Sequence, residues 1–178
     1  MKPLILASAL FVSACLLAVH LRDASIEVRA ASLPKVVLNA ESITPRAIEQ
    51  RTGEMVTHNY AQAWQDMAAC VETNRTDLLN DYFTGEAKAR LTHLISDQRK
   101  SGLRTHYEDR GHEVKAVFYS ADGGEIQLED QARVEVQIFD GQKMIYSSTS
   151  SRKYLVLMTP GADRWYVRSL ESVGDETF

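Results

Sequence analysis

The sequence has few cysteines and no cluster of basic residues, and these shortages exclude several classes of protein. Its 178 residues include two cysteines, Cys15 in an apolar segment and Cys70 in a helical pattern. A disulfide framework and a cysteine-based zinc site are therefore excluded, because each needs more thiols within one domain. Acidic residues outnumber basic ones, 24 to 20, for a formal net charge of −4. This balance gives no reason to expect a nucleic-acid partner.

Catalytic motifs are also lacking. The chain contains no glycine-rich phosphate loop, no nucleophile elbow and no His-Glu-x-x-His pair. One group of ligand-type residues occurs, His106-x-x-Asp109-x-x-His112. The intervening Arg110-Gly111 is typical of a loop, and no fourth ligand is evident. We therefore expect neither a metal ion nor another cofactor.

The longest apolar run, LILASALFVSACLLAVHL, spans Leu4 to Leu21 and allows three interpretations. As a helix it would be about 27 Å long, enough to anchor the chain in a bilayer. Alternatively, Val12-Ser13-Ala14-Cys15 resembles a bacterial lipobox, with Cys15 as the residue to be acylated. A third possibility is cleavage further on, after Val28-Arg29-Ala30.

The first two interpretations share one consequence, which is an exported domain held at a membrane surface. We expect the bacterial cell membrane, with the C-terminal domain on its periplasmic side. The predicted organisation is an anchor or signal over residues 1–21, a tether over 22–45, a folded domain over 46–173 and a tail over 174–178. Pro34 and Pro45, with no sustained hydrophobic period between them, favour the tether.

Helical periodicity dominates the first half of the folded domain. Thr44-Pro45 is typical of a helix start, and apolar residues then recur every three or four positions to Val71, which predicts a long amphipathic helix ending near Asn74. A shorter helix is expected from Thr76, and a third from Thr84-Gly85 to a stop at Gly102.

Beyond Thr105 the period changes to two, which predicts strands. They are expected at His112–Tyr119, from Ile126 to about Ile138, at Lys143–Met158 and at Arg164–Leu170. Turn residues such as Asp122-Gly123-Gly124 and Asp140-Gly141 separate them. The fold class is therefore α+β: after the apolar N-terminal helix, a cone-shaped roll of three helices packed on a curved antiparallel sheet of about four strands.

This arrangement resembles the nuclear transport factor 2-like superfamily over about residues 48–173. Its marks are Tyr60 and Trp64 on the long helix, Asp81-Tyr82-Phe83 ending the short one, and the closing strand DRWYVRSLES. Two branches also carry an apolar segment and tether before the roll. They are the inner-membrane assembly subunit of type IV secretion systems and the membrane-associated rolls of mitochondrial import and plastid division. In both, the resemblance implies a roll that binds protein.

The stretch SGLRTHYEDRGHEVKAVFYSADGGEIQLEDQARVEVQIFD is similar to the import and plastid-division group. The chain departs from the secretion subunit because its apolar segment lies at the extreme N-terminus, without a cytoplasmic segment.

Other members of the superfamily are isomerases and dehydratases, so the resemblance also implies a cavity that can hold catalytic groups. Asp130 is the one candidate, because it has the parity of Leu128 and Ala132 and a regular strand would point it inward. We expect instead a β-bulge at residues 129–131 that turns Asp130 to solvent. The residues expected to line the cavity are Tyr60, Trp64, Met67, Phe118 and Trp165.

Two functions follow from these patterns. The first is a non-catalytic protein-binding module in an envelope or secretion assembly, with other subunits or a second copy as partner. The second is a small-ligand binder or isomerase-like enzyme with Asp130 as base and a tyrosine as hydrogen-bond donor. An open pocket lined by Asp130 and tyrosines would favour the second function. A cavity filled by Trp64, Met67, Phe118 and Trp165 would exclude it.

Overall fold

A computed structural model describes residues 32–41 and 43–174. The apolar run, Cys15 and residues 175–178 lie outside this range. Within it, no helix is long and apolar enough to cross a membrane. In chain order the elements are β1 (Val36–Asn39), α1 (Gln50–Thr73), α2 (Leu79–Tyr82), α3 (Gly85–Lys100), β2 (Leu103–Tyr119), β3 (Ile126–Asp140), β4 (Lys143–Pro160) and β5 (Trp165–Val173).

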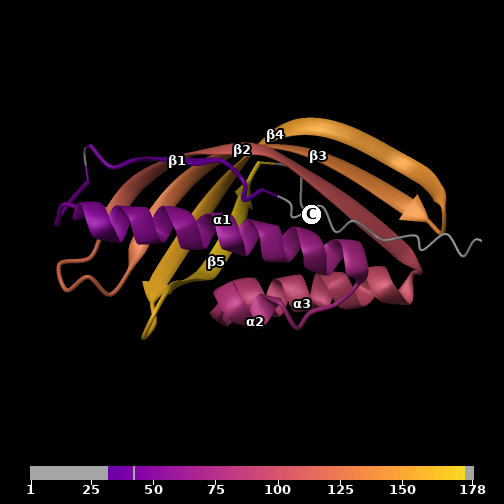
Figure 1. Cartoon of the computed structure of the whole chain (residues 1–178), viewed down its shortest axis with the longest axis horizontal. Coiled ribbons are helices and arrows are strands. Elements are labelled where there is room, and N and C mark those ends of the chain that lie inside the picture. The colour runs from indigo at the N-terminus through magenta and orange to yellow at the C-terminus, as the bar shows by residue number, and fades with distance from the viewer. Residues whose placement is uncertain (1–31, 42, 175–178) are drawn as a thin grey trace, which may run out of the picture. The chain divides into compact units, whose positions relative to one another are not determined.

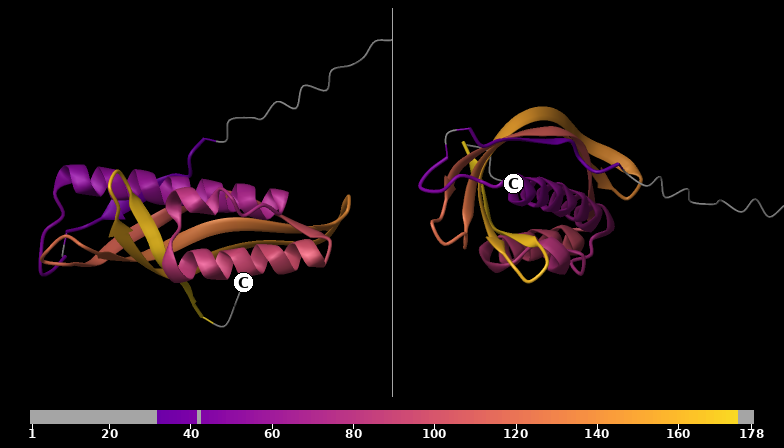
Figure 2. Two further views of the ribbon diagram at one scale, coloured as in Figure 1. Left: turned by 90° about the horizontal axis from the view of Figure 1, so that it is seen from below. Right: turned by 60° about the vertical axis from the view of Figure 1, so that its left-hand side comes forward.

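The five strands form one curved sheet in the order β1-β2-β3-β4-β5. β2 to β5 are antiparallel neighbours, as expected for strands joined by tight turns. The sheet curls around α1, with α2 and α3 on the same concave side (Figures 1 and 2). The predicted α+β roll of three helices on a curled sheet is therefore present, with a mixed rather than purely antiparallel sheet.

The sheet has one strand more than the four expected. β1 lies in the range interpreted as a tether and pairs in parallel with β2, from Val36 opposite His112 to Asn39 opposite Lys115. Four residues are too few to show a reliable period of two, so this strand has no distinct pattern in the sequence. Leu38 of β1 packs against the core, which is the tertiary contact that fixes it.

The long helix starts later than predicted. Thr44 and Pro45 are not its cap, because the Thr44 carbonyl accepts a hydrogen bond from Tyr119 N at 3.2 Å and Pro45 bridges to Tyr119 of β2. These contacts keep the backbone extended, and α1 begins at Gln50. Its predicted end is confirmed, since Asn74 is the left-handed C-cap with φ 55°.

Two β-bulges make β2 differ from its prediction. The strand starts at Leu103, so Arg110-Gly111 is not a loop but the site of a register shift between Asp109 and Gly111. A second shift, between Ala116 and Phe118, reverses the parity of the strand. Tyr119 therefore enters the core, and Phe118, which was expected there, does not.

The core lies between α1 and the concave side of the sheet. The stripe predicted for α1 is buried, and it includes Cys70, which no solvent reaches. Burial raises the pKa of the Cys70 thiol to about 11. This thiol is therefore a small core side chain at neutral pH, as its helical position predicts.

Asn59 joins α1 to the closing strand, because its Oδ1 accepts a hydrogen bond from the buried Trp165 N at 2.8 Å. In Asn59→Ala that N–H loses its partner, which we expect to lower the free energy of unfolding by about 1–3 kcal/mol. Chemical denaturation followed by circular dichroism measures the change. His58→Ala, an exposed position on the same helix, is the control, and an equal loss there would contradict this role of Asn59.

Candidate functional site

Asp130 points into the cone, so the expected bulge at residues 129–131 is wrong. The register of β3 with β4 runs without interruption from Glu129 through Gln131, and Asp130 keeps the inward parity of its neighbours. Its side chain has no solvent exposure. A buried carboxylate requires compensating partners, and other strands and helices supply them.

Four side chains form a buried polar network around Asp130. The hydroxyl of Tyr60, on α1, donates to Asp130 Oδ2 at 2.7 Å. His112, on β2, contacts the same oxygen through Nδ1 at 2.7 Å and reaches Asp109 Oδ2 through Nε2 at 2.6 Å. Among the described residues, Asp130 Oδ1 has no hydrogen-bond partner. We call Tyr60, Asp109, His112 and Asp130 the buried network.

The geometry requires His112 to be protonated at both ring nitrogens. Each nitrogen faces a carboxylate oxygen, which accepts but does not donate, so both must carry hydrogen. Burial alone lowers the pKa of His112, but the hydrogen bonds and charges of Asp109 and Asp130 outweigh it and raise the pKa to about 9. The network at neutral pH is thus an imidazolium between two carboxyl groups.

Aromatic rings enclose the imidazolium. The ring centroid of Trp64 lies 4.6 Å from that of His112, and the Tyr60 ring is 5.7 Å away. The face of an indole attracts a cation, which adds to the two carboxylates. Burial, and then the charge of Asp130, raise the pKa of Tyr60 well above its usual value, so Tyr60 remains a donor.

The His-x-x-Asp-x-x-His pattern is divided by the fold. Asp109 and His112 meet inside the network, whereas His106 is half exposed and its Nδ1 contacts Glu72 of α1 at 2.8 Å. The bulge at residue 110 explains why residues three apart on a strand share the inner side. Within the described part of the chain, no group of three or more His, Cys, Asp or Glu residues is arranged to hold a metal ion.

A cavity of about 300 Å³ opens between α1, α3 and the strands β2, β3 and β4. We call it the cone mouth. It is lined by Met67, Val71, Leu91, Leu94, Gln98, Leu103, Thr105, Tyr107, Val136, Ile138, Tyr146 and Arg152. Tyr60, His112 and Asp130 do not line it. Asp130 is among the lining residues of another hollow, of about 650 Å³ and formed by β2, β3, β4 and Val173, but its carboxylate has no solvent exposure.

The residues expected to line a cavity have different positions in the fold. Met67 does line the cone mouth, while Tyr60 and Trp64 fill the interior behind it. Trp165 is buried beside Tyr119, with 6.3 Å between ring centroids. Phe118 lies outside the core cluster. Of the four side chains expected to fill the cavity, Trp64 and Trp165 are buried, Met67 is buried beside the cone mouth and Phe118 is not in the core.

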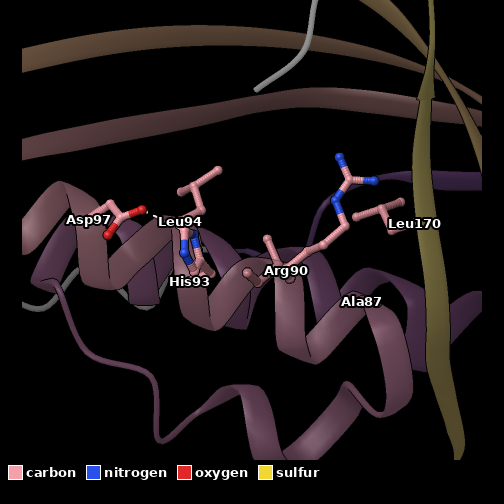
Figure 3. A pocket seen from close by; sticks show the side chains of 7 residues that line it. Ala87, Arg90, His93, Leu94, Asp97 and Leu170 are labelled. Carbon is pink, nitrogen blue, oxygen red and sulfur yellow. Dashed lines mark ion pairs between the residues drawn. The ribbon is translucent and has the colours of Figure 1, made fainter.

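A second hollow, of about 430 Å³, lies outside the cone between α3 and β5. Arg90 extends from α3 toward Leu170 of β5, and His93 forms an ion pair with Asp97 one turn further along the helix (Figure 3). The His93 side chain is 80% exposed, and an exposed pair of this kind contributes little to stability. This hollow is shallow surface between two elements and holds no buried polar group of its own.

Solved structures share the arrangement of helices and sheet. The intermembrane space region of the chloroplast protein ARC6 matches with a TM-score of 0.62 and 16% identity, over 74% of this chain and all of that one. A candidate scytalone dehydratase from Novosphingobium aromaticivorans matches with a TM-score of 0.50 and 9% identity, over 71% of this chain and 89% of that one. No protein-family model and no curated protein sequence matches.

The fold is nuclear transport factor 2-like. The resemblance inferred from the long helix and the closing strand is confirmed at the level of fold. At these identities the likeness carries no residue roles. The nuclear transport factor 2-like cone of this chain must be interpreted from its own side chains.

Sequence reasoning missed the roles of His112 and Asp109 in the nuclear transport factor 2-like interior. Both were considered only as metal ligands, on either side of Arg110-Gly111, which was expected to be a loop. The one available indication was the parity of His112 with Val114 and Ala116 on the predicted strand. The sequence contained no such indication for Asp109, because its inward position depends on the bulge between Asp109 and Gly111.

The raised pKa of His112 predicts a loss of stability in alkali. Its contribution is complete below the unfolded-state pKa of 6.5 and is lost as pH rises through the folded-state pKa of about 9. We expect the free energy of unfolding to fall by about 3 kcal/mol across this window. Urea titrations at pH 6, 7.5 and 9.5 measure it. The fall should disappear in His112→Gln and persist in His58→Gln, and a flat profile in the unaltered chain would rule out the charged network.

Removing the hydroxyl of Tyr60 tests the third arm of the network. Tyr60→Phe deprives Asp130 Oδ2 of a buried donor, so we expect a loss of about 1–3 kcal/mol in the free energy of unfolding. Tyr146→Phe is the matched control, because Tyr146 is 48% exposed. Equal stabilities for the two variants, measured by urea denaturation, would show that the hydrogen bond contributes nothing net.

Proposed function

We propose that this chain is a non-catalytic protein-binding module, exported and held at a membrane surface by its N-terminal segment, that acts as a subunit of an envelope or secretion assembly. One observation carries the proposal. The carboxylate of Asp130, which turns into the cone interior, has no solvent exposure, and neither it nor Tyr60 or His112 lines the cone mouth. The polar groups of the interior therefore stabilise the fold, and the binding function is assigned to the protein surface.

The closed network is costly to open. His112 and Asp130 have no side-chain exposure, and their charges compensate each other at 2.7 Å. Separating such a pair to admit a substrate would leave a buried charge without a partner, which costs about 3–5 kcal/mol. Asp130 therefore lacks the access that a general base needs.

The cone mouth offers a site for a partner's side chain. Most of its lining is apolar, and Gln98, Thr105 and Arg152 supply polar groups at its wall. A volume of about 300 Å³ is at the small end for ligand sites and suits one or two anchor residues of a protein. Tyr146, which is 48% exposed, extends this lining to the protein surface.

The membrane part of the proposal rests on the sequence. The apolar run of Leu4–Leu21 follows Met1-Lys2-Pro3 directly and has the length of a membrane anchor or a lipoprotein signal. Both alternatives would hold the folded domain close to a bilayer. Mass spectrometry of the mature N-terminus separates retention, acylation at Cys15 and cleavage.

Site-specific photo-crosslinking tests the binding function. A benzoylphenylalanine at Leu94, in the cone mouth, should crosslink to a discrete second protein in membranes of the native host. The same group at Gln127, an exposed residue on the convex side of β3, is the control and should give no such product. Absence of a product from Leu94, or identical products from both positions, would contradict the proposal.

A second candidate function is binding of a small apolar ligand in the cone mouth, and the cavity itself favours it. Native mass spectrometry of the gently purified chain would then show a bound mass. Ile138→Trp, which fills the cavity, should abolish that mass. A ligand mass combined with no protein crosslink from Leu94 would favour this candidate over the first.

A further inference from the structure

The two flanking strands of the sheet are shorter than the strands they pair with, so two edges remain open. β5 covers β4 only from Lys153 to Pro160, and β1 covers β2 only from His112 to Lys115. Within the described residues, residues 143–152 of β4 and 103–111 of β2 therefore have a partner strand on one side only. Open edges expose unpaired backbone groups that another strand can join.

The open edge of β2 is protected. It carries charged residues, and Arg104 and His106 both contact Glu72 of α1. At its start, the Asn74 side chain donates to the carbonyl of Leu103 at 2.8 Å. Charged side chains and a covering helix are the usual means by which natural sheets prevent further pairing.

The open edge of β4 has fewer of these protections, because its charged residues, Lys143 and Arg152, lie only at its two ends. Its residues 144–151, MIYSSTSS, include no charged residue and no proline. Every one of these side chains is exposed or half-buried. Small hydroxyl side chains also leave room for an approaching strand. In the left half of Figure 2 and in Figure 1, the hairpin of β3 and β4 extends past the helices, so no helix covers its end.

Exposed apolar side chains lie at both ends of this edge. Met144 and Ile145, each 51% exposed, are at one end. Leu155 and Val173, 45% and 50% exposed, lie just beyond the other end, where β5 covers β4 and pairs Val173 with Lys153 and Glu171 with Leu155. In an antiparallel pair related by a two-fold axis, each end of one strand lies against the opposite end of the other. The edge is therefore complementary to itself.

We propose that β4 pairs antiparallel with β4 of a second copy of this chain across a two-fold axis centred near residues 148 and 149. The pairing joins the two five-stranded sheets into one and places the Met144 end of each copy against the Leu155 end of the other. About this axis residues 145–152 of the two copies face each other, with Ile145 opposite Arg152, so no like charges oppose each other within the segment and the positive charges of Lys143 and Arg152 lie at its ends. About eight residues a side is fewer than the roughly 20–30 of a standard interface, so the dimer is weak, with a Kd of micromolar order.

Sedimentation velocity of the full chain in detergent tests this contact. We expect a monomer–dimer equilibrium that Thr149→Lys weakens about tenfold or more, because the new charges face each other near the two-fold axis. Gln127→Lys adds the same charge to an exposed position on a strand paired on both sides, and it should leave the equilibrium unchanged. Circular dichroism confirms that both variants are folded.

A cysteine pair gives a second readout. Oxidised Thr149→Cys should form a covalent dimer in excess of the parent chain and of Gln127→Cys. A chain that stays monomeric, or a dimer that Thr149→Lys leaves unchanged, would overturn the proposal, since association would then be absent or due to another segment. The purified chain alone is used, so the result is independent of any partner crosslinked from Leu94 in the cone mouth.

Discussion

The charged contact between His112 and its two carboxylate partners is the interaction on which the interior of this protein depends. It joins β2 to β3 through Asp130, and Tyr60 adds α1 to the same oxygen. A cation with an acceptor at each ring nitrogen tolerates little displacement, so the network fixes how the long helix sits on the curved sheet. The aromatic rings around the network exclude water, so the attraction between the imidazolium and the carboxylates stays strong.

This arrangement places the polar chemistry of the chain where it supports the fold and leaves the surface features open. The cone mouth lies beyond Tyr107, outside the network, and the open strand edge lies further out on the β3–β4 hairpin. The interior and the strand ends therefore have different roles. The rigid interior holds the long strands in position, and the uncovered ends of these strands remain accessible to other molecules. Fold likeness to ARC6 and to a dehydratase is compatible with either use of the cone, so the side chains decide.

The sequence predicted the elements with strong periods and missed those set by tertiary contacts. The stripe of α1 and the end of that helix at Asn74 were predicted correctly, because each depends on local spacing and a cap. β1 was missed because four residues carry little pattern. The bulge near Phe118 was invisible for a different reason, since an extra residue in a strand leaves both halves equally apolar. In the site, parity correctly pointed Asp130 inward, but without its partners a charge there looked too costly.

The parallel pairing of β1 with β2 also has a mechanical consequence. The chain enters the folded region at Lys35, whose carbonyl accepts from His112 N at 2.9 Å, and β1 then runs alongside β2 for four paired positions. A pull along β1 from its N-terminal end would load these hydrogen bonds together, in shear, rather than one after another as in peeling. Tension arriving from that direction would thus meet its resistance beside the imidazolium, at the strongest point of the interior.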